Sequence, residues 1–276
     1  MIIKKAYVLG TRVDKSLSPI IFNYWIKKYK INAKYSYKKI KEKDFKKEIG
    51  LILKEKNLCG LNITIPFKEK IINKLQKLDK PSKIIGASNC ITIKKNKYYG
   101  SNTDWTGFTK ALKDSKFEQK NKHQKNKIII LIGYGGAAKA ILYSLSLMKR
   151  ANKKNTIVFN RSKRKINIPF ISQKKTISLN KLERYLDKAC LIINTTPKNI
   201  LNDLKIKKIT KKIAVCDIVY KPRETSFLKH FINPTSKIYG IDMLINQARP
   251  CFYKWFGILP SKDKILTNKL LKKIIK

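Results

Sequence analysis

The feature that most constrains the fold of this chain is a fully apolar run followed at once by closely spaced glycines. Residues 128–132 read IIILI, and residues 133–138 read GYGGAA. A short run of large aliphatic residues is typical of a strand buried on both faces of a parallel sheet, and the glycines indicate a tight turn. The apolar-rich segment up to Met148 predicts a helix, and residues 156–159 predict another strand. The region therefore predicts a strand, a turn, a helix and a strand in succession.

The small residues of this turn fit the G-x-G-x-x-G/A fingerprint of dinucleotide-binding units. In that pattern Gly133 makes the turn, Gly135 lets a pyrophosphate approach the backbone, and Ala138 lets the helix pack on the strand. The flanking strand and helix are the ones that the fingerprint requires. We therefore predict that the turn contacts a dinucleotide through Gly133, Gly135, Gly136, Ala137 and Ala138.

The residues after the second strand of this unit indicate which dinucleotide binds. An NAD site places Asp or Glu there to hold the ribose 2′-hydroxyl, whereas this chain reads NRSKRK over residues 160–165. Arg161 can pair with a 2′-phosphate, and two of the seven arginines of the chain fall within these residues. We predict that the cofactor is NADP and that the contacts are made by Asn160, Arg161, Ser162 and Lys165.

The charge balance is extreme and raises the question of a nucleic-acid partner. The 276 residues include 64 Lys and Arg against 17 Asp and Glu, a net charge of +47. Specific contacts to phosphates and bases use the arginine fork, yet only seven of these cations are arginine, and the lysines are spread along the whole chain. We expect mostly a solvated basic surface that prefers anionic ligands, without a nucleic-acid partner.

Cysteine, histidine and hydropathy exclude several other classes of protein. The five cysteines form no C-x-x-C pair, and neither His123 nor His230 has a patterned metal or nucleophile partner. This predicts reduced thiols, no metal site and no histidine-based mechanism. No stretch approaches the roughly 18 apolar residues of a membrane span, and no signal-peptide cleavage site is visible, so we expect a cytoplasmic protein without a membrane partner.

The first hundred residues also alternate strands with helices, which predicts an α/β fold of two domains. A polar segment, 114–127, reads as the linker before the glycine-rich unit. The expected strands are 6–10, 33–40 and 60–65, with a hairpin of 89–93 and 97–100, and the expected helices are 19–29, 43–56, one starting at Pro66, and 105–112.

Two residues stand out as candidates for proton transfer. Lys68 falls in the first turn of the helix expected from Pro66, at the carboxyl end of a strand, where α/β proteins bind ligands. A helix N-terminus disfavours an ammonium group unless a partner holds it, and Asp104, between the hairpin and the next helix, is the best-placed carboxylate. The Tyr-x-x-x-Lys pairs that begin at Tyr24, Tyr35 and Tyr37 all precede the glycine turn and are no more frequent than chance predicts.

Nine segments, in order along nearly the whole chain, resemble the shikimate dehydrogenase family. They are 16–19 with Asn23, 62–68, 86–89, 102–104, 133–138, 160–162, 194–197, 217–220 with Pro222 and Thr225, and 240–247. The resemblance implies a discontinuous substrate domain of residues 1–104 and 243–276, a doubly wound Rossmann-type NADP domain of residues 105–242, and an active site in the cleft between them. It further implies a monomer or homodimer that uses NADPH to reduce 3-dehydroshikimate reversibly to shikimate, in aromatic amino-acid and chorismate biosynthesis.

The resemblance also assigns roles to single residues. It implies that the substrate carboxylate is held by Ser16, Ser18, Thr64 and Tyr220, that ring hydroxyls bind Asn89, Asp104 and Gln247, that Lys68 and Asp104 handle the proton, and that Ile218 and Gly240 contact the cofactor. The alternate spacing of Ser16 and Ser18 predicts two hydroxyls on one side of an extended turn, although Ser18 would also suit a helix N-cap before Pro19.

Four departures from the family pattern leave alternatives open. Phe22 stands where histidine is usual, Cys90 where threonine is usual, Trp105 where glycine is common, and Lys198-Asn199 where a small, glycine-containing pair follows the proline. The last change would lie near the nicotinamide. The alternatives are a quinate/shikimate dehydrogenase that also accepts NAD, and a weakly active relative that acts as a basic nucleic-acid-binding protein.

Overall fold

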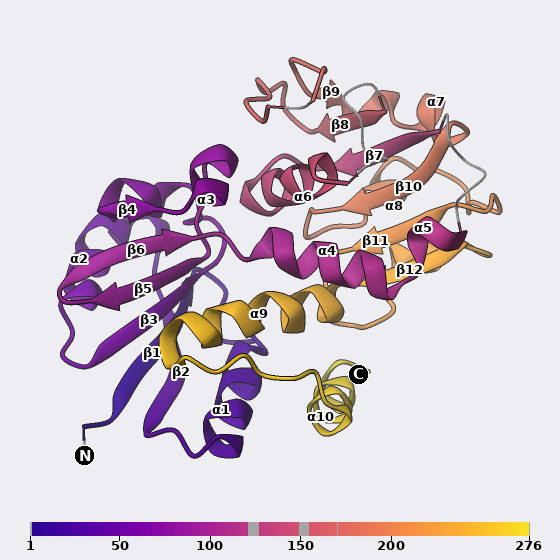
Figure 1. Ribbon diagram of the computed structural model, residues 1–276. Helices are drawn as coiled ribbons and strands as arrows, with labels where there is room; N and C mark the ends of the chain where they lie inside the picture. Colours follow the sequence, from indigo (N-terminus) through magenta and orange to yellow (C-terminus); the bar gives the residue numbers. More distant parts are fainter. Residues whose placement is uncertain (1, 121–126, 149–154, 170, 276) are drawn as a thin grey trace. The chain divides into compact units, whose positions relative to one another are not determined.

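The structure, a computed structural model, describes residues 2–120, 127–148, 155–169 and 171–275 (Figure 1). The chain divides into two compact units. The first contains residues 1–103 and 247–270, and the second contains residues 104–246 and 271–276. Compared with the expected borders, Asp104 and the segments 243–246 and 271–276 fall in the second unit. No helix in the described ranges has both the length and the apolarity that a membrane span needs.

The first unit is built on a mixed six-stranded sheet. Its parallel part has β1 between β2 and β3, and β5 and β6 form the expected antiparallel hairpin beside β3. Lys95 and Asn96 have φ values of 48° and 57°, as a two-residue hairpin turn requires. The strands in sheet order are β2 (Ala33–Lys39), β1 (Lys4–Gly10), β3 (Leu58–Ile63), β5 (Cys90–Lys94), β6 (Lys97–Ser101) and β4 (Lys77–Leu78).

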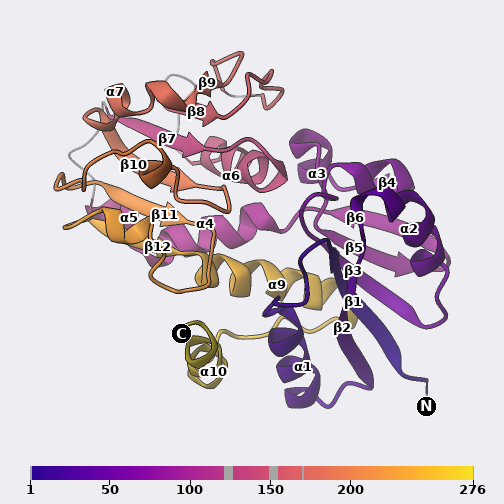
Figure 2. The same cartoon turned by 180° about the vertical axis from the view of Figure 1, so that it is seen from behind.

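Short helices accompany this sheet, and α1 packs against β2 and β1 (Figure 2). Helix α3, which the sequence reading missed, begins where the Asp79 carboxylate accepts from the backbone N–H of Ser82 at 2.8 Å, and it ends at Gly86 with φ of 67°. The helices of this part of the chain are α1 (Ser18–Lys28), α2 (Phe45–Leu53), α3 (Lys80–Ile85) and the 3₁₀ turns η1 (Glu42–Asp44) and η2 (Lys70–Lys74).

The helix expected from Pro66 is absent, and a turn takes its place. The Ile65–Pro66 bond is cis, Phe67 N–H donates to Thr64 O at 2.9 Å, and the first helical element is the 3₁₀ turn η2, which begins at Lys70. The Lys68 carbonyl accepts from the backbone N–H of Ser88 at 2.8 Å, so it is engaged outside any local helix. Lys68 therefore lies in a turn, and the helix-dipole argument for its environment was wrong.

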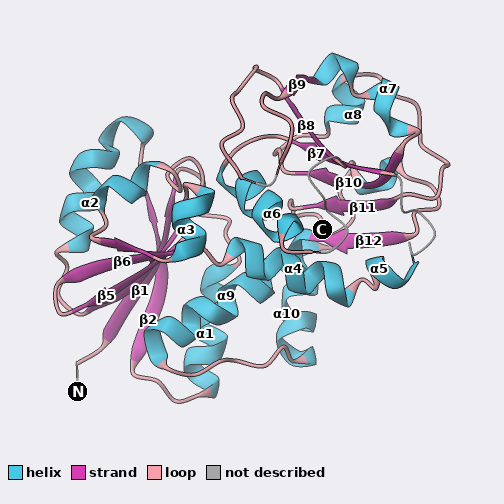
Figure 3. Cartoon of the chain, turned by 45° about the horizontal axis from the view of Figure 1, so that its top comes forward, coloured by secondary structure: helices cyan, strands magenta, loops and turns pink. Residues whose placement is uncertain are grey.

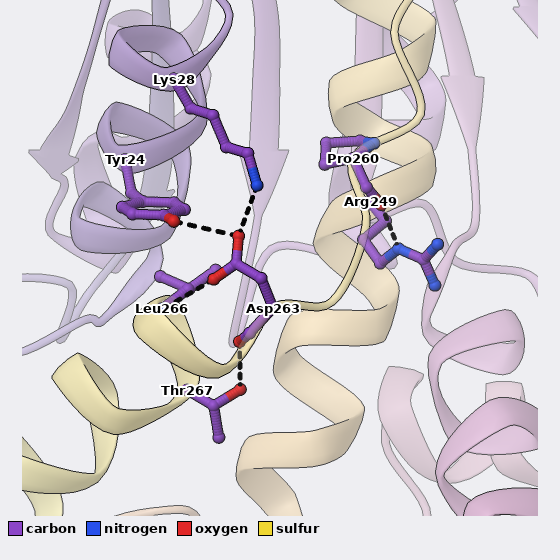
Figure 4. A network of polar contacts seen from close by, with 7 residues as sticks. All are labelled: Tyr24, Lys28, Arg249, Pro260, Asp263, Leu266 and Thr267. Carbon is purple, nitrogen blue, oxygen red and sulfur yellow. Dashed lines mark hydrogen bonds and ion pairs between the residues drawn. The ribbon is translucent and has the colours of Figure 1, made fainter.

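A polar network fastens the C-terminal segment of the first unit to α1 (Figure 4). The carboxylate of Asp263 accepts from Tyr24 Oη at 3.0 Å and from Lys28 Nζ at 2.8 Å. Its other oxygen accepts from Leu266 N–H at 2.8 Å and so caps α10 (Lys264–Ile274). Because one carboxylate serves both helices, the start of α10 is fixed relative to α1.

The second unit contains a parallel six-stranded sheet with the strand order of the dinucleotide-binding fold. Counted from β7, the order is 3-2-1-4-5-6, and the direction of winding reverses between β7 and β10. This confirms the prediction of a doubly wound Rossmann-type unit. The strands in sheet order are β9 (Ile177–Ser178), β8 (Thr156–Asn160), β7 (Ile128–Ile132), β10 (Ala189–Asn194), β11 (Ala214–Asp217) and β12 (Ser236–Tyr239).

Helices cover both faces of this sheet, which explains the continuous apolar run in β7 (Figure 3). Ile129 and Leu131 pack into one buried cluster with residues of α4 and α6, whereas Ile130 and Ile132 pack into another with residues of α7 and α8. The helices are α4 (Asp104–Asp114), α5 (Phe117–Lys120), α6 (Gly136–Ser146), α7 (Glu183–Leu186), α8 (Ile200–Asp203), the 3₁₀ turns η3 (Leu179–Lys181) and η4 (Leu228–His230), and α9 (Gly240–Phe256), which ends in the first unit.

The segment expected to be a linker is partly helical. Helix α5 occupies residues 117–120, and Phe117 is buried in the cluster with α4. The apolar ring of Phe117 explains the difference, since it anchors a segment that is otherwise polar. Residues 121–126, which include His123, lie outside the described part of the chain.

Candidate active site

Ser16 and Ser18 lie together at the start of α1. The Oγ of Ser16 accepts from the backbone N–H of Ser18 at 3.2 Å, and Ser18 is 4% exposed. Ser18 is the first residue of the helix, and the N-cap position belongs to Leu17. The two serines are therefore neighbours, as expected. They are held by a helix start and not by an extended turn, because Pro19 favours the first helical turn.

The turn after β3 carries Thr64 and Lys68. Thr64 N–H donates to Leu9 O at 2.9 Å, which extends the pairing of β3 with β1 beyond the strand. A Cβ on Gly10 would lie 2.4 Å from Cγ2 of Thr64, so the close approach of these two segments requires glycine. The bond from Ser88 N–H to Lys68 O joins the same turn to the segment that leads into β5. Both candidate side chains are thus placed by bonds to neighbouring segments.

Asn89 and Gln247 meet in a buried polar cluster of the first unit. Asn89 Nδ2 donates to Gln247 Oε1 at 3.2 Å and to Thr103 Oγ1 at 3.0 Å, while Asn89 Oδ1 accepts from Thr103 N–H at 2.7 Å. The structure therefore brings together two residues that are 158 positions apart in the chain. Thr103 was missed as a member of the cluster, although it adjoins Asp104 in the segment 102–104.

A second layer of polar groups lies against this cluster and was also missed. Asn62 Nδ2 donates to Asn89 O at 3.2 Å and to Cys251 Sγ at 3.2 Å, and Tyr35 Oη donates to Asn62 Oδ1 at 2.8 Å. Tyr35 is 1% exposed and Asn62 is 6% exposed. No local sequence pattern connects β2, β3 and α9, so only the fold reveals this layer.

The remaining residues expected around the substrate lie in the second unit. Asp104 is the first residue of α4 and is 4% exposed, and Tyr220 is partly buried after β11. Lys68 belongs to the first unit. The pairing of Lys68 with Asp104 and the meeting of Tyr220 with the serines stay predictions.

The glycine turn between β7 and α6 has the geometry that was predicted from its small residues. Gly133 has φ of 99°, and a Cβ there would lie 2.4 Å from Thr195 Oγ1. Gly135 precedes the helix and faces open space, since a Cβ there would meet no atom within 4 Å. Ala138 is fully buried. The exposed backbone at Gly135 and the start of α6 can hold a phosphate group, so these residues fit a dinucleotide.

The loop after β8 is shaped by its own hydrogen bonds. Asn160 Nδ2 donates to Ser162 O at 2.9 Å, and Arg164 N–H donates to Thr176 Oγ1 at 2.9 Å. Arg161 and Lys165 are exposed. No carboxylate lies in this loop, so its electrostatics favour a 2′-phosphate over a 2′-hydroxyl.

A buried carboxylate, which the sequence reading missed, joins the loops after β10 and β11. Asp217 Oδ2 accepts from Thr225 Oγ1 at 2.6 Å, and its Oδ1 accepts from Val219 N–H at 3.0 Å and Asn194 Nδ2 at 3.1 Å. Burial raises the pKa of Asp217 to about 6, although these three hydrogen bonds oppose the shift. Asp217 therefore fixes the backbone that carries Ile218.

Gly240 and the departures near the cofactor turn also have local explanations. A Cβ on Gly240 would lie 2.4 Å from Ile218 O, so the start of α9 can approach that loop only as glycine. Asn199 caps α8 by accepting from Leu201 N–H at 3.2 Å, and the Trp105 ring packs edge-on against Tyr143 at 5.5 Å. The changes at Trp105 and Asn199 are therefore accommodated within the second unit.

Comparison with known proteins gives the same relatives by sequence and by structure. A family model described as the shikimate dehydrogenase substrate binding domain matches residues 8–91. An NADP(+) shikimate dehydrogenase of Staphylococcus haemolyticus is 34% identical over 262 residues, 93% of this chain and 94% of its own length. One from Pelagibacter ubique is 35% identical over 277 residues, 97% of this chain and 99% of its own length.

Solved structures of shikimate dehydrogenases are similar to this chain over almost its full length. The crystal structure of shikimate dehydrogenase from Aquifex aeolicus superposes with a TM-score of 0.75 at 31% identity, covering 98% of this chain and 99% of that one. A shikimate dehydrogenase in complex with NADP+ superposes with a TM-score of 0.76 at 29% identity, covering 99% and 96%.

Proposed function

This chain belongs to the shikimate dehydrogenase family, and we propose on that premise that it catalyses the reversible, NADP-dependent reduction of 3-dehydroshikimate to shikimate. The observation that carries the proposal is the similarity of both units, over more than nine-tenths of the chain, to relatives named for this activity. The reaction serves aromatic amino-acid and chorismate biosynthesis. The cytoplasm is the compartment that we propose for it, as a monomer or homodimer without a nucleic-acid partner.

The first unit would bind the substrate. The hydroxyls of Ser16, Ser18 and Thr64, with Tyr220 of the second unit, would hold the carboxylate through neutral donors, which avoids burying an extra charge. Asn89 and Gln247 would bind ring hydroxyls, because their amides offer both donors and acceptors and are already fixed against each other. Asp104 would bind a further hydroxyl.

The second unit would bind NADP. The backbone from Gly133 to Ala138 would hold the pyrophosphate, Arg161 with Asn160, Ser162 and Lys165 would hold the 2′-phosphate side, and Ile218 and Gly240 would adjoin the nicotinamide. When bound, NADPH supplies the hydride for the ketone carbon. The groups that donate and accept the proton must come from the protein.

Lys68 and Asp104 would handle the proton. The ammonium group of Lys68 would donate to the oxygen that becomes the C3 hydroxyl, and Asp104 would stabilise the charged lysine between turnovers. This assignment follows from the residues that match the family segments.

The experiment is a comparison of kcat/KM for shikimate and quinate, each with NADP+ and with NAD+, using the purified chain. We expect shikimate with NADP+ to exceed every other combination by at least about tenfold, since the loop after β8 offers cations to a 2′-phosphate. Comparable values with quinate and NAD+ would indicate the broader quinate/shikimate activity. Absence of turnover with all four combinations would refute the proposed function.

A further inference from the structure

The buried hydroxyl of Tyr35 has an environment that core packing alone does not explain. Its ring stacks on Phe22, with centroids 4.2 Å apart and planes at 7°, and it lies 6.1 Å from the Trp255 ring at 25°. Phenylalanine would satisfy these ring contacts equally well. A hydroxyl buried this deeply destabilises the fold unless it forms a hydrogen bond.

Tyr35 is held in place from both its backbone and its ring. Asn23 of α1 donates from Nδ2 to Tyr35 O at 2.8 Å and accepts from Tyr35 N–H on Oδ1 at 3.0 Å. Such a two-point contact fixes β2 against α1 at this residue. Because the backbone of Tyr35 is held in place, its hydroxyl can orient the groups to which it is hydrogen-bonded.

Sheet register aims the phenol across β1 toward Asn62. Tyr35 is paired with Ala6, and Asn62 with Val8, so both side chains leave the same face of the sheet. The result is the 2.8 Å bond from Tyr35 Oη to Asn62 Oδ1.

This bond decides which way the Asn62 amide faces. With Oδ1 occupied by the phenol, Nδ2 points to the Asn89 carbonyl and to Cys251 Sγ. Asn89 in turn contacts Thr103 and Gln247, the cluster assigned to the ring hydroxyls. The phenol is thus linked, through Asn62, to the amide end of the proposed substrate site.

The buried Tyr35 phenol is neutral at ordinary pH. Burial raises the pKa of Tyr35 well above its usual value, and the nearby Cys251 raises it further. A neutral phenol is a permanent donor to Asn62. Its contribution should therefore not vary with pH.

We propose that Tyr35 is a positioning residue for shikimate, which orients Asn62 and, through it, Asn89 and Gln247. The inference rests on the proposed function, because it takes the substrate from there. It adds a residue of β2 to the residues proposed to surround the substrate. The residue acts on binding and not on hydride or proton transfer.

The test compares Tyr35→Phe with Tyr7→Phe in the full-length protein. Tyr7 is a matched control: it is 7% exposed, lies on the neighbouring strand β1, and donates to Glu55 at 2.8 Å, away from the cluster. For Y35F we expect the KM and the calorimetric Kd for shikimate to rise about tenfold, the size expected when a buried acceptor loses its donor. The KM for NADP+ and the shape of the pH profile should be unchanged, and kcat should stay within about threefold. Y7F should leave both KM values within about twofold of the wild type.

A double-mutant cycle with Asn62→Ala tests whether Tyr35 acts on shikimate binding through Asn62. If Tyr35 acts through Asn62, adding Y35F to N62A should raise the shikimate KM by much less than Y35F does alone. Fully multiplicative effects, an unchanged shikimate KM in folded Y35F, or an equal rise in Y7F would each overturn the inference. If Y35F does not fold, N62A decides: a higher shikimate KM with an unchanged NADP+ KM supports the inference, and an unchanged shikimate KM overturns it. Wild-type protein without shikimate turnover would instead refute the proposed function, before any variant is compared.

Discussion

At the scale of single residues, we expect Arg161 to decide the choice of cofactor. Arg161 follows β8 in a loop that contains no carboxylate, so its guanidinium is the group best suited to a 2′-phosphate. We expect Arg161→Ala to remove most of the preference for NADP+ over NAD+, measured as the ratio of the two kcat/KM values. An unaltered ratio would exclude Arg161 from this role without affecting the enzyme class.

A second residue-scale prediction concerns the proton. Replacing Lys68 with alanine should lower kcat by about 10² or more, the range for a positioned proton-transfer group, with a smaller change in the KM for shikimate. If Lys68 and Asp104 act as one unit, adding Asp104→Ala to Lys68→Ala should cost much less than the product of the single losses. Steady-state kinetics of the three variants supply the comparison. Full multiplicativity would show that the two residues act independently.

Asp217 predicts a pH dependence of stability. Its pKa is raised from 3.8 to about 6 in the folded protein, so between these values the folded state binds more protons than the unfolded state. The contribution of this group to the free energy of unfolding is therefore largest at low pH and is lost as pH rises through about 6. It amounts to about 3 kcal/mol for a shift of this size.

Asp217→Asn supplies the measurement, because an amide cannot titrate. Urea unfolding of the wild type and of D217N at pH values near 4 and 7 should show the mutant gaining stability relative to the wild type at the higher pH. Other ionisable groups cancel in this difference. A difference independent of pH would mean that Asp217 titrates normally despite its burial.

At the scale of elements, the glycine turn before α6 separates a folding requirement from a binding requirement. Gly133 has positive φ and no room for a Cβ, so Gly133→Ala should lower the free energy of unfolding by about 1–3 kcal/mol. Gly135 faces open space with negative φ, so Gly135→Ala should leave stability nearly unchanged while weakening NADP+ binding at the pyrophosphate. Chemical denaturation and NADP+ titration measure the two effects. Equal stability losses in both variants would contradict this division.

The elements also show what sequence reasoning could and could not reach. The β7 strand, its glycine turn and the hairpin at Lys95 were predictable because local patterns specify them. The turn at Lys68 was not, because its carbonyl bonds to Ser88, a partner from another segment. The Tyr35–Asn62 bond reaches across the central strand β1, and the Asp217–Asn194 bond joins β11 to β10, so both depend on the strand order of the folded sheet.

At the scale of the whole molecule, the net charge of +47 must be carried by an otherwise ordinary α/β fold. Few acidic partners are available, so most lysines repel one another across the surface. We expect the thermal unfolding midpoint to rise as salt increases from about 10 mM to about 150 mM, where the screening length falls from about 30 Å to about 8 Å. A midpoint that falls over this range would mean that attractive ion pairs outweigh the repulsion.

Oxidation of shikimate by NADP+ is followed by the initial rate of NADPH formation. Purified wild-type protein with shikimate and NADP+ should form NADPH at a rate that saturates in both substrates. The Lys68→Ala variant, prepared in parallel, should be slower by about 10² or more. Equal rates for the wild type and the variant, or no NADPH formed by the wild type, would contradict the account.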